Sequence, residues 1–146
     1  PTAIVSVYRA DYSLYIKEHL YRTGLTNRDI SEELDKLALD RTPIICDSAE
    51  PKSIEELHRI GHNVKPSKKG PDSIRLGIDI MKRHKLFVLK DSLNAQKEFR
   101  NYRWEVDRNG VQLNKPIDHT NHIIDAVRYV CINRIGTSYS GKYYIS

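Results

Sequence analysis

The segment at residues 42–57, TPIICDSAEPKSIEEL, constrains the fold of this chain more than any other. Its apolar run at residues 43–46 is bounded by turn-forming residues, which predicts a buried strand. Pro51 suits the first turn of a helix that follows this strand. Asp47 is therefore expected at the carboxyl end of a central strand, the edge at which open α/β sheets hold their ligands. The alternative is that Asp47 only caps the following helix.

The rest of the chain alternates predicted strands and helices. Residues 2–9 and 14–21 predict a β-hairpin, and Thr26 with Asp29 predicts the start of a helix that ends near Asp40. The first of these helices should bury a core stripe of Leu34, Leu37 and Ala38, and a second helix should run from Pro51 to about Ile60 with Ser53 and Glu56 as a capping box. An extended piece at 63–66, a helix from Asp72 or Ser73 with Ile74, Ile78 and Met81 on one face, and a buried strand at 86–89 are expected next. The last expected elements are a helix at 93–99 capped by Asp91 or Ser92, a hairpin of 102–106 and 111–113, and a helix at 119–135 that buries Ile123, Ile124, Val127, Val130 and Cys131. This order predicts an α/β domain over residues 1–135, a mixed β-sheet flanked by helices, and a loosely held tail at residues 136–146.

Composition narrows the class of partner. The formal net charge is +5 and the pI is near 9.2, which favours a polyanion, nucleic acid first. The sequence has no GxxxxGK[ST] or GxGxxG motif, so it predicts no nucleotide site. No apolar run approaches the length of a membrane span, so we expect no membrane partner. Cys46 and Cys131 lie in apolar surroundings and are predicted to be free thiols.

The last predicted helix carries the second group of chemically active side chains. His122 and Asp125 are three residues apart, so they share one face of that helix. Asp125 lies between apolar residues, and a partly buried carboxylate needs a partner, commonly a metal ion. Arg128 is the alternative partner, three residues further along. Together, Asp47 and Asp125 would suit a hard cation such as Mg²⁺ or Mn²⁺.

Six blocks of sequence follow one another between residue 1 and Tyr129. They are PTAIVSVY, LYRTGLTNRDI, CDSAEPKSIEEL, VKPSKKGPDSI, YRWEVDRNG and NHIIDAVRY. Together they resemble the nuclease domain of the phage terminase large subunit, the protein of the DNA-packaging motor. The resemblance implies an RNase H-like fold and an endonuclease that cleaves concatemeric double-stranded DNA with two divalent metal ions, Mg²⁺ or Mn²⁺.

The resemblance also implies roles for five residues. Asp47 corresponds to the acid that follows the central strand and Asp125 to the acid of the last helix, and both would hold metal and serve catalysis. His122 corresponds to a catalytic histidine near the metals. Lys68 and Lys69 correspond to a basic turn that contacts DNA. The alternatives are an ordinary helix histidine for His122 and a solvated turn for the two lysines.

The chain departs from the family pattern in two places. The family pattern has a first strand upstream of the segment that begins at Pro1, and its aspartate would bridge the metals. The chain as it stands is therefore expected to lack that strand, to bind metal poorly and to cut poorly. At the second place, Asn121 stands where an acid often precedes the histidine.

The resemblance implies a set of partners and a location. The partners are double-stranded DNA, the terminase ATPase domain, the small terminase subunit and the portal protein, in the cytoplasm of the bacterial host. Two other functions stay open. One is an RNase H-like junction resolvase or transposase-type nuclease. The other is a catalytically inactive module that binds DNA or the portal.

Overall fold

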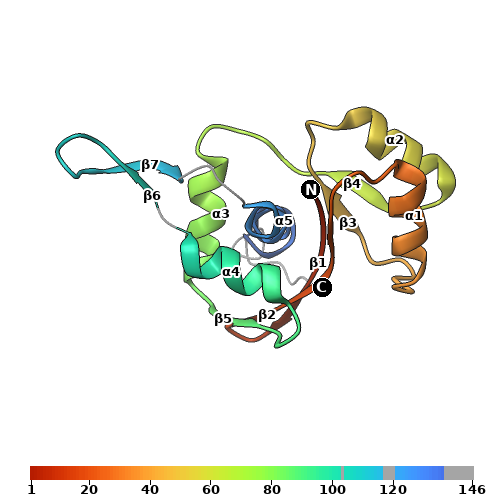
Figure 1. Ribbon diagram of the computed structural model, residues 1–146, viewed down its shortest axis with the longest axis horizontal. Helices are drawn as coiled ribbons and strands as arrows, with labels where there is room; N and C mark the ends of the chain where they lie inside the picture. Colours follow the sequence, from red (N-terminus) through yellow and green to blue (C-terminus); the bar gives the residue numbers. More distant parts are fainter. Residues whose placement is uncertain (103, 117–120, 137–146) are drawn as a thin grey trace.

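The computed structural model describes residues 1–102, 104–116 and 121–136. Its strands are β1 (Thr2–Ala10), β2 (Ser13–Arg22), β3 (Ile44–Cys46), β4 (Val64–Pro66), β5 (Lys85–Val88), β6 (Trp104–Val106) and β7 (Gln112–Pro116). Its helices are α1 (Asn27–Asp35), α2 (Pro51–Ile60), α3 (Ser73–Lys82), α4 (Leu93–Asn101), α5 (His122–Val130) and the π-helical η1 (Cys131–Ile135). Figure 1 shows α5 enclosed between the strands β1 and β2 and the helices α3 and α4, with α1 and α2 on the other side of these strands. The predicted mixed α/β architecture is confirmed.

The predicted N-terminal hairpin is also confirmed. β1 and β2 pair antiparallel, and the register shifts at a bulge between Ile4 and Val5. Side chains of a strand alternate between its two faces, so Leu14 and Ile16 point together toward the helices, and neither is exposed to solvent. The hairpin therefore supplies one wall of the core.

The strand predicted at residues 86–89 forms, but it is not buried. β5 pairs in parallel with β2 and lies at the edge of the sheet order β1-β2-β5. Leu86 and Phe87 are 36% and 45% exposed. Phe87 instead stacks on Tyr15 of β2, with ring centroids 5.0 Å apart. An apolar run thus marked a strand correctly but did not distinguish an edge strand from a central one.

α1 begins as predicted and ends early. The Thr26 hydroxyl accepts a hydrogen bond of 3.1 Å from the Asp29 N–H, and the Asp29 carboxylate accepts one of 2.9 Å from the Thr26 N–H. The helix ends at Asp35 rather than near Asp40. Ala38 and Asp40 have φ angles of 47° and 54°, which a right-handed helix does not allow. Ala38, predicted to belong to the core, is exposed.

β3 and β4 form a separate two-stranded parallel sheet. β3 is half-buried, and in the described ranges it pairs only with β4, so the expectation of a buried central strand is not met. α2 follows with Pro51 in its first turn and ends at Gly61, whose φ of 117° suits a glycine C-cap. The predicted box of Ser53 and Glu56 does not form, because the helix begins at Pro51 and Ser53 lies inside its first turn. The Glu56 carboxylate instead accepts a hydrogen bond of 2.8 Å from Asn27 of α1.

α5 is the centre of the core. Its predicted stripe is confirmed at Ile123, Ile124, Val127 and Cys131, each at most 1% exposed, and Val130 is partly buried against the same cluster. The residues packed around them are Leu14, Ile16, Ile78, Ile80, Met81, Ala95 and Ile135. Ile74 of α3, expected on the buried face, is instead 37% exposed. The opposite face of α5, which carries His122 and Asp125, is thereby left outside the apolar core.

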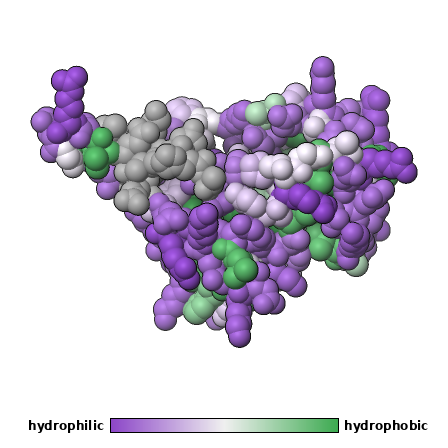
Figure 2. Space-filling view, viewed as in Figure 1, coloured by the Kyte–Doolittle hydropathy of each residue, from purple (hydrophilic) through white to green (hydrophobic). Residues whose placement is uncertain are grey.

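The predicted second hairpin forms at β6 and β7, which pair antiparallel and extend away from the rest of the molecule (Figure 1). Gly110 closes its turn with a φ of 77°. Figure 2 shows hydrophilic residues over most of the face in view. Within the described residues, no helix is both long enough and apolar enough to cross a membrane. Most of the expected tail, residues 137–146, and the expected helix start at residues 119–120 lie outside the described residues.

Candidate active site

Asp47 follows directly on β3, as predicted, and its side chain is exposed. Its Oδ1 accepts a hydrogen bond of 2.9 Å from the Ala49 N–H. This bond orders the turn between β3 and α2 and does not cap the helix, whose N-cap residue is Glu50. In the part of the chain that the structure describes, Asp47 has no ion-pair partner. The capping alternative is therefore wrong, and the turn bond engages Oδ1 of this carboxylate.

The basic turn lies beside Asp47 because of strand topology. β3 and β4 are parallel neighbours, so the residues that follow them emerge at the same edge. The Ser67 N–H, next after β4, donates a hydrogen bond of 2.8 Å to the Cys46 carbonyl, next before Asp47. Lys68 and Lys69 follow Ser67, and both are exposed. The structure thus brings the two predicted lysines to the same edge as Asp47.

Asp125 lies on the half-exposed face of α5. Arg128, the alternative partner considered from the sequence, does contact it, with Nη2 3.2 Å from Asp125 Oδ1. The Asp125 side chain is 43% exposed and the Arg128 side chain 9% exposed. Arg128 also lies over the Tyr129 ring, 4.9 Å from its centroid. The ion pair orients the carboxylate from within the protein and leaves part of it open to solvent.

The charge of Asp47 acts on the carboxyl of Asp125. Burial raises the pKa of the Asp125 carboxyl, Arg128 and His122 lower it, and the negative charge of Asp47 raises it further. Burial and the charges of Asp125 and Asp47 likewise raise the pKa of Tyr129. Two carboxylates that repel each other favour a cation between them. No cluster of three or more His, Cys, Asp or Glu side chains suited to a metal ion occurs in the described ranges.

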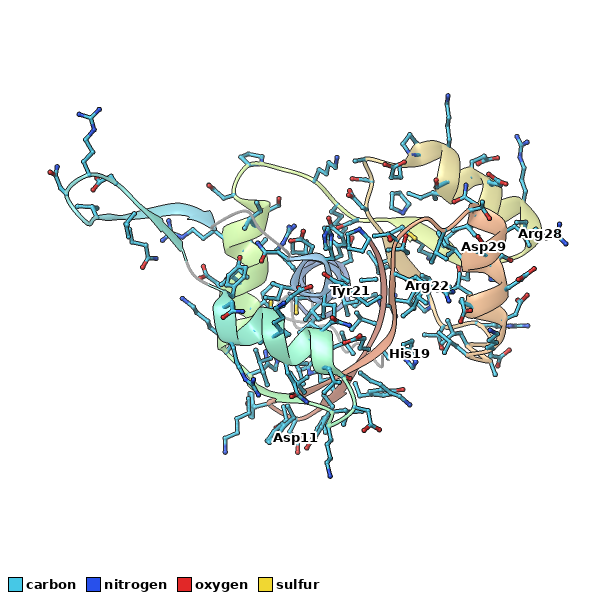
Figure 3. The ribbon with its side chains drawn as sticks, viewed as in Figure 1. Asp11, His19, Tyr21, Arg22, Arg28 and Asp29 are labelled. Carbon is cyan, nitrogen blue, oxygen red and sulfur yellow. The ribbon has the colours of Figure 1, made fainter. Side chains whose placement is uncertain are left out.

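His122 is the first residue of α5, one turn before Asp125, as predicted. Its ring meets the edge of Tyr21 of β2, with centroids 6.0 Å apart. Tyr21 and its neighbour Arg22 lie on opposite sides of β2, Tyr21 toward α5 and Arg22 toward α1 (Figure 3). The structure therefore brings together four of the predicted elements of the site, namely Asp47, the basic turn, His122 and Asp125.

Sequence reasoning missed Glu98 of α4. Its side chain is 4% exposed, and its Oε1 accepts hydrogen bonds of 2.9 Å from the Ile123 N–H and 3.1 Å from the Ile124 N–H. Burial raises the pKa of Glu98, while the Ile124 and Ile123 amides and the Tyr21 hydroxyl lower it. A buried glutamate is unusual unless it is paired. The sequence signal that could have indicated it is an acid placed next to the apolar Phe99 within a predicted helix. Glu98 caps the helix that carries His122 and Asp125.

A mixed sheet packed against helices, with one acid after a strand end and a second on a neighbouring helix, fits a domain of the RNase H-like class. The family model for the terminase RNase H-like domain matches residues 2–131, and the chain belongs to that family. It is 39% identical over 122 residues to the large terminase subunit of Bacillus phage SPP1, a match that covers 80% of this chain and 28% of that protein. The chain therefore spans only about a quarter of that curated relative.

Solved structures agree with this family. The nuclease domain of the large terminase g2p from phage SPP1, with bound Mn, superposes with a TM-score of 0.77 at 27% identity, over 88% of this chain and 76% of that domain. The large terminase of a thermophilic bacteriophage superposes with a TM-score of 0.71 at 21% identity, over 91% of this chain and 36% of that chain. The second likeness supports the fold alone.

Proposed function

We propose that this nuclease domain is a metal-dependent endonuclease that hydrolyses phosphodiester bonds of concatemeric double-stranded DNA through a two-metal site. The observation that carries the proposal is the convergence of Asp47 and Asp125, which come from a strand end and a helix. Burial and the Asp47 charge both raise the pKa of Asp125, and a cation would relieve that repulsion. The bound Mn in the SPP1 nuclease domain supports the same chemistry.

The residues present fit a hard divalent cation. Both candidate ligands are carboxylates, Asp47 is exposed and Asp125 is partly exposed. Mg²⁺ and Mn²⁺ are commonly held by one or two carboxylates together with waters and substrate phosphates. When bound, such ions would supply Lewis-acid stabilisation to the charge that develops on the phosphate. An upstream aspartate as a further ligand stays a prediction from the family resemblance.

The remaining residues of the site would hold the substrate and the acids. Lys68 and Lys69 would contact backbone phosphates, so they would contribute affinity with little sequence preference. Arg128 would hold Asp125 in one orientation through their ion pair. His122, beside both Asp125 and Tyr21, would accept or donate a proton near the scissile bond. The ATPase domain, the small subunit, the portal and the cytoplasm of the bacterial host belong to the same proposal.

Cleavage of supercoiled plasmid with Mn²⁺, Mg²⁺ or EDTA tests the proposal. It should be run on this chain and on a version extended upstream by about 20 residues, enough for one strand and its turn. Asp47→Ala and Asp125→Ala should each abolish cutting, and Asp79→Ala, an exposed acid on α3, should not. Undiminished cutting by both site variants would overturn the assignment of the acids.

One alternative function remains to be separated by the same experiment. Family membership favours the terminase assignment over a junction resolvase or a transposase-type nuclease. A catalytically inactive binding module would show DNA binding in EDTA and no cutting by either form of the chain. In that case Asp47 and Asp125 serve the structure only, through the turn bond to Ala49 and the ion pair with Arg128.

A further inference from the structure

The two acids of the site belong to different parts of the fold. Asp47 follows β3, whose sheet contains β3 and β4 only, within the described residues. Asp125 lies on α5, which packs on β1 of the other sheet as well as on β3. No described backbone ladder joins the two sheets. The distance between the acids therefore depends on side-chain contacts between α5–η1 and the smaller sheet.

Asn133 of η1 makes the hydrogen bonds that cross this junction beside the site. Its Oδ1 accepts a hydrogen bond of 3.0 Å from the Lys68 N–H. Its Nδ2 donates one of 2.9 Å to Ser67 Oγ and one of 2.7 Å to the Tyr129 carbonyl. Both amide protons and the oxygen are thus engaged, and only a carboxamide supplies this set of two donors and an acceptor.

The contact reaches both acids through short connections. Ser67 is 5% exposed, and its N–H donates to the Cys46 carbonyl at 2.8 Å, one residue before Asp47. On the other side, Tyr129 is one helical turn after Asp125, on the same face of α5. Asn133 therefore joins the strand end that carries one acid to the helix that carries the other.

The backbone at Asn133 is itself unusual. The helix changes from α to π at Cys131. π segments are rare overall, and those that occur are often found at functional sites. Asn133 is half-buried in this segment, next to the buried Ile132. Its side chain is held by the Tyr129 carbonyl near the end of α5 and by the turn after β4.

We propose that Asn133 is a positioning residue, which sets the separation of Asp47 and Asp125 and places the turn of Lys68 and Lys69 beside them. The proposal rests on the proposed function for its catalytic consequence. Its structural part, a fixed relation between the two sheets, can be measured without metal or DNA. Residues that hold metal ligands in place typically change metal affinity or activity about 10–100-fold when they are removed.

The matched pair of variants is Asn133→Ala and Asn63→Ala. Asn63 precedes β4, and its Nδ2 donates a hydrogen bond of 2.8 Å to the Arg41 carbonyl, at the opposite end of the same small sheet. Spin labels on Lys52→Cys of α2 and Lys97→Cys of α4, both exposed positions, report the distance between the two parts. Asn133→Ala should broaden or shift that distance, and Asn63→Ala should leave it narrow. An unchanged narrow distance in Asn133→Ala would overturn the proposal.

A second readout connects the distance to the site. Calorimetric titration of the upstream-extended chain with Mn²⁺ should show affinity about 10–100-fold weaker in Asn133→Ala than in wild type and Asn63→Ala. Ser67→Ala removes one of the three bonds and should shift the affinity in the same direction by less, which keeps the test available if Asn133→Ala does not fold. Unchanged Mn²⁺ affinity in both Asn133→Ala and Ser67→Ala would also overturn the positioning role. If the upstream-extended wild type neither binds Mn²⁺ nor cuts, the proposed function fails, while the label distance still decides whether Asn133 positions the two parts.

Discussion

The Glu98 carboxylate accepts a hydrogen bond of 2.9 Å from the backbone N–H of Ile123, so a side chain of α4 caps the first turn of α5. The same oxygen accepts from Ile124, and these two amides lie between His122 and Asp125. A single buried acid thereby fixes the start of the helix that carries both residues. The N–H groups of the first turn of a helix have no carbonyl acceptor within the helix, so their acceptor must come from another part of the chain or from solvent.

Removing this cap should destabilise the fold. Glu98→Ala leaves two buried amides without their acceptor, and a loss of about 1–3 kcal/mol in unfolding free energy is expected. Glu98→Gln keeps an acceptor oxygen and should lose less. Urea unfolding measures both, with Glu55→Ala, an exposed acid paired with Arg59, as the control. Equal stability of Glu98→Ala and Glu55→Ala would contradict the capping role.

The raised pKa of Glu98 predicts a pH dependence. The folded chain holds the Glu98 proton more tightly than the unfolded chain, whose glutamate has the usual pKa of 4.5, because burial disfavours the charge. The resulting stability is present below that value and is lost as pH rises through the raised pKa. Glu98→Gln does not titrate, so its stability relative to wild type should increase as the pH rises above the usual glutamate pKa. Urea midpoints at increasing pH measure the effect, and a constant difference would contradict it.

Gly77 of α3 should not tolerate a side chain. A Cβ built at Gly77 meets Cγ and Cδ of Arg128 and Cδ1 of Ile132. Gly77→Ala should therefore cost about 1–3 kcal/mol of unfolding free energy, although alanine favours helix. In an Arg128→Ala background the same change should cost much less. A double-mutant cycle in urea tests this, and an identical cost in both backgrounds would remove Arg128 as the reason.

Both thiols should be unreactive in the folded protein. Burial raises the pKa of Cys46 to about 11, with a smaller contribution from the Asp47 charge, and burial raises the pKa of Cys131 to about 12. At pH 8 the thiolate fraction of Cys46 is then about one in a thousand. Ellman's reagent should label neither thiol quickly until urea unfolds the chain. Rapid labelling of Cys131 under native conditions would show that this part of the core opens readily.

The basic turn should set the salt dependence of DNA binding. If Lys68 and Lys69 contact phosphates, replacing both by alanine should weaken binding similarly for unrelated sequences. It should also reduce the slope of log affinity against log salt by about 1–2. Fluorescence anisotropy in EDTA at several salt concentrations measures both quantities. Lys36→Ala, on the turn after α1 and paired with Glu33, is the control, and an equal effect there would argue against a specific contact.

Local sequence patterns predicted the helices and strands, and contacts between distant segments determined which partners cap and pack them. The capping box of Thr26 and Asp29 formed because both partners lie in one turn. Ser92 does precede α4, but its hydroxyl accepts a hydrogen bond of 2.9 Å from the Glu18 N–H of β2, 74 residues away. The Glu18 carboxylate in turn accepts from the Ala95 N–H and caps that helix. The residues near position 92 do not include Glu18, so the local sequence could not predict that Glu18 caps this helix in place of Ser92.

The candidate site shows the same division. The spacing of His122 and Asp125 placed them on one helix face, and the strand-then-acid pattern placed Asp47 at a strand end. The contributions of Glu98 and Asn133 depend on contacts with segments 25 and 65 residues away in the chain, so spacing could not indicate them. The ion pair of Asp125 with Arg128, weighed from the sequence as an alternative, is present together with the proposed arrangement.

The parallel pairing of β2 with β5 has a consequence for how the chain is made. Ser13 pairs with Lys85, and the helix that completes the core lies at His122–Val130, after every described strand. Contacts of such long sequence separation slow folding, because the intervening chain must be closed into a loop first. During translation the hairpin of β1 and β2 leaves the ribosome long before the helix that covers it. Its apolar face must therefore wait for α5, and chaperones that shield such faces would act during that interval.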